Sequence, residues 1–386
     1  MMDRPVLAEV TFKTLESDRL AGSANYKVQR CVRGMIQEGA YVFATSFLFY
    51  LMIYTILALS MNIEYGYTGV PNLGKVLFYF VGGIVTAVIA TRVYDAILGI
   101  EDPLSAVSAA KRVELAASEP LLAISVFVAS LVAGGLTAGL LGYLASYPAL
   151  ALKGSSLSIT LLIFGEAARV FVRTYEPLVG GVFGISGIAN PFVFLREPLA
   201  ISTAYLVTTA LITVAILVLV ERITNSPFGR VMKAVRDDEL AAYALGKDAA
   251  SVRGWALFIG SALAGIAGSL YTFYSQAIFP DDFIPSLTFF VLTMVIVGGV
   301  ANNLGVVVGA LLMSLIERFS QASTLALIGI HVPFDISYVR YALTGALIVV
   351  FLLYRPRGLI EERPVKTPLY EVLSGRRKAQ KLRIGR

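Results

Sequence analysis

The stretch from Gly254 to Pro280, GWALFIGSALAGIAGSLYTFYSQAIFP, carries no charge and decides the class of this protein. A helix needs about 20 mostly apolar residues to cross the hydrocarbon core of a bilayer, and this stretch is long enough. Comparable runs lie at 40–63, 76–91, 121–152, 199–220, 283–316 and 341–354. We therefore predict an all-α, polytopic membrane bundle of roughly eight to ten spans, some of them broken or re-entrant.

The composition of the 386-residue chain agrees with this class. Hydrophobic residues make up 57% of the chain and charged residues only 15%, whereas soluble domains average about a quarter charged residues. This excludes a disordered chain, a disulfide scaffold and most soluble enzymes. The single cysteine, Cys31, allows no internal disulfide, and the single histidine, His331, excludes a histidine-rich metal site. We expect neither a metal nor a cofactor.

Two apolar runs differ from a simple span. The run at 283–316 is too long for one untilted helix and contains Gly298-Gly299-Val300-Ala301-Asn302-Asn303, so we predict two short spans folded around a turn. The run at 155–172 carries Glu166 and Arg169 and is a weaker span. Small residues recur four apart at Gly260, Ala264 and Gly268, a spacing that predicts close helix packing in lipid.

The distribution of Lys and Arg predicts the orientation, because these residues favour the cytoplasmic side. The tail at 355–386 holds ten basic residues against three acidic ones, and the loop at 221–253 is also basic. We assign 1–39 to an N-terminal cytoplasmic segment, 40–354 to a transmembrane domain and 355–386 to a basic cytoplasmic tail. The charge excess belongs to this tail and does not indicate nucleic-acid binding.

The number of crossings in the first half does not fit this orientation. A cytoplasmic N-terminus requires an even number of crossings before the 221–253 loop, but five runs precede it. Either one segment is re-entrant or a further crossing lies near 179–194. The first 39 residues contain no apolar core of a signal peptide, so we expect none to be cleaved.

Glycine and proline interrupt the chain between the first two apolar runs. Asn303-Leu304-Gly305 repeats Asn72-Leu73-Gly74 in a second Gly-rich break, and paired breaks in two halves of a transporter are typical of a central pathway. The residues predicted to line that pathway are Gly66, Gly69, Asn72, Gly74, Lys75, Glu166, Gly298, Gly299, Asn303 and Gly305. The stretch 69–75 also resembles a phosphate-binding loop, but Val76 replaces the required Ser or Thr, so this chain itself is not expected to hydrolyse ATP.

Three ionisable residues lie in or beside the spans, where charge is costly. Glu166 has a structural explanation as an intrahelical pair with Arg169. For Lys75 the corresponding explanation is snorkelling to an interface, and for Glu64 a position at the interface. The sequence shows no chain of carboxylates and histidines, which disfavours proton-coupled transport.

The loop at 221–253 predicts an amphipathic helix from 226 to 246. Ser226 is suited to cap its start, Pro227 to occupy its first turn and Gly246 to end it. Apolar residues recur at helical spacing, and the other faces carry charges of both signs. A lipid-surface helix would be richer in Lys and Arg, so this pattern favours docking into a protein groove.

At this loop the chain resembles the membrane subunits of ATP-binding-cassette importers. Glu239-Leu240-Ala241-Ala242-Tyr243-Ala244-Leu245-Gly246 resembles their EAA coupling motif with its following glycine. The run from Asn225 to Gly246 is similar to the M-type permease of branched-chain amino-acid importers. The similarity continues at 264–271, 295–299, 66–69 and 164–166. The chain departs from the family before the second span, where Asn72, Gly74 and Lys75 replace a Ser and a Gly-His pair.

The resemblance implies one half of a heterodimeric permease in the cell membrane. Its partners would be a second permease subunit, two cytoplasmic ATP-binding subunits that hydrolyse ATP, and an extracytoplasmic substrate-binding protein. The implied cargo is a branched-chain or hydrophobic amino acid, moved by alternating access. The residues implied to contact the ATPase are Phe228, Val231, Val235, Arg236, Asp237, Asp238, Glu239, Ala241, Ala242 and Gly246. Urea or a short amide as cargo, and an ATP-independent channel or secondary carrier, remain alternatives.

Overall fold

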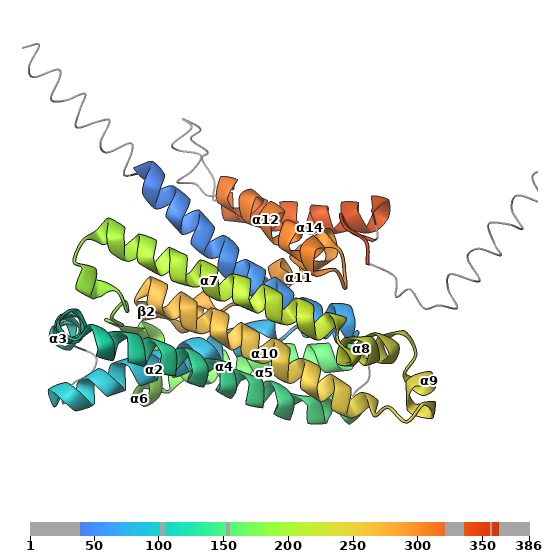
Figure 1. The fold of residues 1–386 in the computed structure, drawn as a ribbon, viewed down its shortest axis with the longest axis horizontal. Helices are drawn as coiled ribbons and strands as arrows, with labels where there is room; N and C mark the ends of the chain where they lie inside the picture. The colour runs from blue at the N-terminus through green and yellow to red at the C-terminus, as the bar shows by residue number, and fades with distance from the viewer. Residues whose placement is uncertain (1–38, 101–104, 152–154, 321–335, 356, 363–386) are drawn as a thin grey trace, which may run out of the picture. The chain divides into compact units, whose positions relative to one another are not determined.

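A computed structural model of the chain describes residues 39–100, 105–151, 155–320, 336–355 and 357–362, and most of them are helical (Figure 1). The predicted N-terminal segment before residue 39, the tail beyond 362, Cys31 and His331 lie outside these residues. The chain divides into two compact units, Met1–Tyr50 and Leu51–Arg386. The description below concerns the second unit, apart from the first helix, Gly39–Tyr67, which begins in the first.

The elements follow one another in a simple order. The first helix ends in the π-helical segment η1 (Asn62–Tyr67). Then come α2 (Lys75–Leu98), α3 (Ala106–Ser118), α4 (Pro120–Ala151), α5 (Ser155–Thr174), α6 (Glu176–Val179), η2 (Gly181–Phe183), β1 (Ile185–Ser186) and η3 (Val193–Leu195). The second half contains α7 (Pro198–Asn225), α8 (Pro227–Asp237), α9 (Glu239–Ala244), α10 (Ala249–Ser275), β2 (Ala277–Ile278), η4 (Pro280–Asp282), α11 (Ser286–Gly298), α12 (Asn303–Phe319) and α14 (Ile336–Tyr354).

Six helical segments within the described residues are long and apolar enough to cross a membrane. They are Gly39–Tyr67, Lys75–Leu98, Pro120–Tyr147, Pro198–Asn225, Ala249–Ser275 and Pro280–Gly298. The helices α5 and α14 have 20 and 19 residues, close to the length of a span. The predicted polytopic helical fold is therefore confirmed.

Small residues bring α2, α4 and α10 into close contact, as the four-residue spacing predicted. A Cβ atom added at Gly268 would overlap the carbonyl oxygen of Tyr79, and one added at Gly82 would overlap that of Gly265. Since lipid supplies no water-driven collapse between helices, such close backbone packing is what holds spans together. These glycines form packing faces.

The run at 283–316 folds as the predicted pair of helices around a turn. Gly299 has a φ of +125°, which suits glycine, and ends α11. The α12 backbone then returns so closely that a Cβ at Gly298 would overlap the carbonyl oxygen of Gly305. The chain after α14 also reaches this turn, where the amide of Ile360 donates to the carbonyl of Gly298 at 3.0 Å.

The segment Val179–Phe194 is not a further crossing, so that alternative is wrong. It contains the short elements η2, β1 and the start of η3, and Ile185 pairs with Ile278 in an antiparallel two-residue ladder. Gly184 and Gly187 have positive φ angles, which interrupt any long helix here.

A buried ion pair fixes the end of the bundle where α2 meets α3. The Arg112 guanidinium donates to both carboxylate oxygens of Asp95, at 2.6 and 2.8 Å, and its side chain is 1% exposed. Figure 1 shows α3 at the end of the second unit opposite to α8 and α9. This bidentate pair ties α3 onto α2.

Candidate functional site

The connector between α7 and α10 consists of two helices, α8 and α9, where one helix was predicted. Ser226 accepts a hydrogen bond from the Gly229 amide at 3.4 Å and Pro227 opens α8, as predicted. Asp238 then adopts an extended conformation, and its carboxylate accepts from the Ala241 amide at 3.0 Å. Asp238 is thus the N-cap of α9. Its carboxylate accepts from a free amide of the first turn, which stabilises the start of a second helix. Gly246, with a φ of +74°, follows the end of α9.

The apolar residues of this connector divide into an inner and an outer set. Gly229, Met232 and Val235 of α8 are buried, as is Ala242 of α9. Leu240, Tyr243 and Leu245 point outward and are 82%, 74% and 79% exposed. Among the residues predicted to contact an ATPase, Phe228, Val231 and Arg236 are half-buried, and Asp237, Asp238, Glu239, Ala241 and Gly246 are exposed.

Arg236 links α8 to two distant segments of the chain. Its guanidinium donates to the carbonyl oxygen of Gly66 at 2.7 Å and contacts Glu362 at 3.0 Å and Asp237 at 2.9 Å. Partial burial lowers its pKa, but hydrogen bonds and charges from Asp237 and Glu362 raise it, so the pKa lies above its ordinary value. Arg236 therefore stays charged and joins α8, η1 and the segment after α14.

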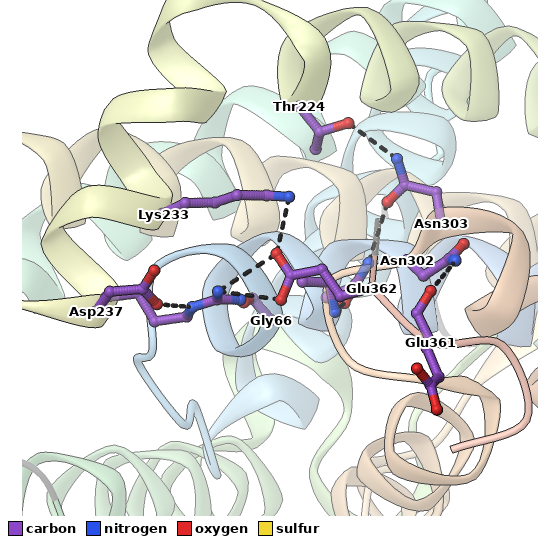
Figure 2. A network of polar contacts seen from close by, with 11 residues as sticks. Gly66, Thr224, Lys233, Asp237, Asn302, Asn303, Glu361 and Glu362 are labelled. Carbon is purple, nitrogen blue, oxygen red and sulfur yellow. Dashed lines mark hydrogen bonds and ion pairs between the residues drawn. The ribbon is translucent and has the colours of Figure 1, made fainter. Parts of the chain in front are cut away.

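Lys233, one turn before Arg236, reinforces the same junction. Figure 2 shows its side chain reaching Glu362, and the Nζ–Oε1 distance is 2.8 Å. The ammonium also lies 5.2 Å from the centroid of the Tyr67 ring, within cation–π range. A polar cavity of about 300 Å³ opens beside it, lined by Tyr67, Glu221, Asn225, Arg230, Lys233 and Asn302 among others.

The two Gly-rich breaks meet beside this cavity. Asn62 of η1 donates to Asn303 at 3.0 Å and accepts from the amide of Ala301 at 2.9 Å. Asn303 donates in turn to Thr224 at 2.9 Å, at the end of α7. The sequence analysis missed Asn62, although a lone Asn inside an apolar run was a signal that could have identified it.

Each of the two breaks contains an asparagine side chain that accepts a hydrogen bond from a nearby glycine amide. The side chain of Asn72 accepts from the Gly74 amide at 3.0 Å, and that of Asn302 accepts from the Gly305 amide at 3.1 Å. The first bond precedes α2 and the second caps α12. Asn302 is the N-cap of α12, whereas Asn72 lies two residues before Gly74, the N-cap of α2, so the two breaks use asparagine at different positions.

Glu64 and Lys75 form an ion pair inside the bundle, with an Nζ–Oε2 distance of 2.7 Å. Their side chains are 0% and 1% exposed, so the predictions of an interfacial Glu64 and a snorkelling Lys75 are wrong. Sequence spacing could not show this, because the turn at 68–74 folds the start of α2 back beside η1. Gly260 of α10 leaves the space for the carboxylate, since a Cβ there would overlap Glu64 Oε1.

The remaining predicted pathway residues lie elsewhere. Glu166 is partly exposed and pairs with Arg169 at 2.5 Å, which confirms the intrahelical pair, and Arg169 also contacts Asp281 at 2.7 Å. Gly69, with a φ of +72°, lies against the side chain of Arg236. The turn residues Gly298, Gly299 and Gly305 pack against one another and against the segment after α14.

We expect Gly260→Ala to lower the stability of the chain by about 1–3 kcal/mol, the usual range for overpacking. The added methyl group would displace the Glu64 carboxylate from its site beside Lys75. Gly165→Ala is the matched control, because its Cβ would lie 3.4 Å from Leu77, an ordinary contact. Thermal unfolding of the detergent-solubilised chain, followed through the single tryptophan Trp255, measures both. Equal midpoints for the two variants would contradict the expectation.

Comparison with known proteins identifies the family. The sequence-family model of the branched-chain amino acid transport system permease component matches residues 43–352 of the chain. A probable branched-chain amino acid transport permease protein LivM from Methanocaldococcus jannaschii is 32% identical over 328 residues, covering 82% of this chain and 92% of that protein.

Two bacterial proteins are also similar. The high-affinity branched-chain amino acid transport system permease proteins LivM of Salmonella typhimurium and Escherichia coli are each 27% identical, over 374 and 355 residues. These alignments cover 90% and 85% of this chain and 75% and 72% of the bacterial proteins. No solved structure matches the chain. The chain, a multi-pass membrane protein, therefore belongs to the branched-chain amino acid transport permease family.

Proposed function

We propose that this protein is a membrane subunit of an ATP-binding-cassette importer, and that it carries branched-chain or other hydrophobic amino acids by alternating access. A second permease subunit, two cytoplasmic ATP-binding subunits and an extracytoplasmic binding protein would complete the importer. The observation that carries the proposal is the outward apolar surface of the α8–α9 connector. Three large apolar side chains, Leu240, Tyr243 and Leu245, are exposed on a short capped helix between two long spans.

The connector suits docking to a protein partner. The inner residues Met232 and Val235 hold α8 against the bundle, so that the outer residues of α9 are free for a second surface. An apolar centre with a charged rim is the usual anatomy of such a contact. Here Asp237, Asp238 and Glu239 are exposed beside the apolar set. We accordingly place the ATPase contact on α9 more than on Phe228, Val231 and Val235.

Movement of the connector would reach the membrane interior through Arg236. Its hydrogen bond to Gly66 O acts on η1, and η1 carries Glu64 two residues earlier. The same guanidinium holds Glu362, beyond the last span. A displacement of α8 by a bound ATPase would therefore pull on the broken end of the first helix and on the chain after α14 together. The polar cavity beside Lys233 would be the space through which cargo leaves.

The basic residues of the connector support a cytoplasmic position for α8 and α9. Arg222, Arg230 and Lys247 are exposed there, and such residues are retained on the cytoplasmic side. The chain after α14 reaches the same end through Glu362, so the tail would be cytoplasmic as well.

The double variant Leu240→Asp/Tyr243→Asp should lose the ATP-binding subunits. Two carboxylates at the centre of an apolar contact would be desolvated without partners, which costs several kcal/mol. The measurement is affinity purification of the tagged chain from its native membranes, with the recovery of ATP-binding subunits compared with the wild type. We expect recovery to fall by about tenfold or more.

Val107→Asp is the control, because Val107 is also an exposed apolar residue but lies on α3, at the other end of the bundle. It should leave the recovery of ATP-binding subunits unchanged. Full recovery with the α9 double variant would overturn the docking role. Gradient-driven leucine flux through liposomes that contain the purified chain alone would instead favour a channel or carrier.

A further inference from the structure

We propose that Glu64 and Lys75 form a binding site for the charged groups of a zwitterionic α-amino acid, with Glu64 taking the ammonium group and Lys75 the carboxylate. The inference rests on the proposed function and names the part of the chain that recognises the cargo. The two side chains pair with each other at 2.7 Å. A zwitterion carries the same two charges, so it can exchange with each partner of this pair.

The pair is incompletely satisfied in its buried site. A lysine ammonium has three donors, and the ion-pair partner of Lys75 within the described residues is the single carboxylate of Glu64. Asn72 and Ser261 lie beside that carboxylate and are 0% exposed. Among the residues that the structure describes, Asn72 Nδ2 and Ser261 Oγ make no hydrogen bond of ordinary geometry, although both interact with the Glu64 carboxylate at longer range. Buried polar atoms without partners are costly, and a ligand that bonds to them recovers that cost.

The charge balance of the site selects the kind of ligand. Glu64 and Lys75 together are neutral, so a cation or an anion alone would leave one buried charge unpaired. A zwitterion pairs with both residues and leaves the total charge unchanged. The Asn72 amide and the Ser261 hydroxyl can then donate to the carboxylate beside Lys75. Uncharged cargo such as urea offers no counter-charge to either residue.

The apolar surroundings of Lys75 select the ligand's side chain. Leu57, Tyr79, Leu287 and Val291 line a narrow crevice beside Lys75, between the first helix, α2 and α11. The crevice has no room for a water molecule in this conformation, so cargo enters only when these helices separate. A hydrophobic side chain would then be buried there while the zwitterionic group meets the ion pair.

The site is tested with the double variant Glu64→Gln/Lys75→Met, which removes both charges and keeps similar volumes. Replacing both partners of a buried pair leaves no unpaired charge, so the fold should survive. The wild-type chain and the variant are placed in lipid nanodiscs, and binding of leucine is measured by saturation-transfer difference NMR, which detects weak ligands. We expect the leucine signal of the variant to fall by about tenfold or more, since charge-assisted hydrogen bonds are lost. The thermal midpoint should change little.

Two leucine analogues test the role of each charge. Leucinamide lacks the carboxylate, and 4-methylpentanoic acid lacks the ammonium group. Both should bind the wild-type chain about tenfold or more weakly than leucine. The matched control Asp95→Asn/Arg112→Met neutralises another buried pair, at the α3 end, and should leave leucine binding unchanged.

Each outcome bears on the inference separately from the proposed function. Wild-type leucine binding by the Glu64→Gln/Lys75→Met variant, or equal binding of leucine and 4-methylpentanoic acid by the wild type, would show that the pair is only structural and overturn the inference. No leucine signal from the wild-type chain would overturn it as well. ATP-driven leucine uptake by vesicles that contain the complete wild-type importer is measured in parallel. If that uptake is absent, the proposed function is overturned. If uptake is normal but leucine binding does not depend on Glu64 and Lys75, the inference alone is overturned.

Discussion

Lys75→Met should destabilise the chain by roughly 3–5 kcal/mol, because it leaves the Glu64 carboxylate buried without its partner. Glu64 is 0% exposed, and Gly260 holds the α10 backbone against its carboxylate. Water therefore has no access that could replace the lost ammonium. The midpoint of thermal unfolding, followed through Trp255 in detergent, should fall well below that of the wild type.

The double variant Glu64→Gln/Lys75→Met should recover most of that stability, since no buried charge is left unpaired. Arg357→Met is a second reference, because the Arg357–Glu361 pair is largely exposed, with a contact of 3.3 Å. An exposed pair of this kind contributes about 0–1 kcal/mol. Equal midpoints for Lys75→Met and Arg357→Met would show that the Glu64 carboxylate is not confined as the structure indicates.

The second large effect is expected for Arg236→Met, which should reduce ATP-driven leucine uptake by about tenfold or more. The variant removes the hydrogen bond to Gly66 O and the pair with Glu362, and so separates α8 from η1. The exposed surface of α9 is unchanged, so the ATP-binding subunits should still be recovered with the chain. The measurements are leucine uptake by membrane vesicles and ATPase activity of the same preparation.

Arg222→Met is the control, because Arg222 is exposed at the end of α7. Its uptake should match that of the wild type. Glu362→Gln removes the negative charge that Arg236 and Lys233 share and should give an intermediate rate. Normal uptake with Arg236→Met would exclude this residue as the connection between the two segments.

Features that depend on local sequence could be predicted without the structure. The apolar runs predicted the spans, because a helix in lipid must satisfy its own backbone and expose apolar side chains. Ser226, Pro227 and Gly246 predicted the start and end of the connector, because capping depends on a few adjacent residues. The turn at Gly298-Gly299 followed from the length of one run. The intrahelical Glu166–Arg169 pair followed from a spacing of three.

Features that depend on contacts between distant segments could not be predicted in this way. The periodicity of the connector did not show which apolar residues face the bundle, so Val235 was predicted as an anchor although it is buried. The break at Asp238 depends on a hydrogen bond from the Ala241 amide to the Asp238 carboxylate. This local bond competes with the backbone bonds of a continuous helix, and the sequence does not show which of the two is more stable. Arg236 joins positions 66 and 362, and no local pattern connects them.

The pair formed by Glu64 and Lys75 marks the boundary between these two kinds of feature. Both residues were recognisable as costly charges beside apolar runs, because the energy of burying a charge depends on residue type and surroundings. Their location inside the bundle depends on the reversal of the chain between η1 and α2 and on a glycine of α10 nearly two hundred residues away. The residue types alone showed that these two charges are costly. The packing of helices that are distant in the sequence determined that the charges form a buried pair.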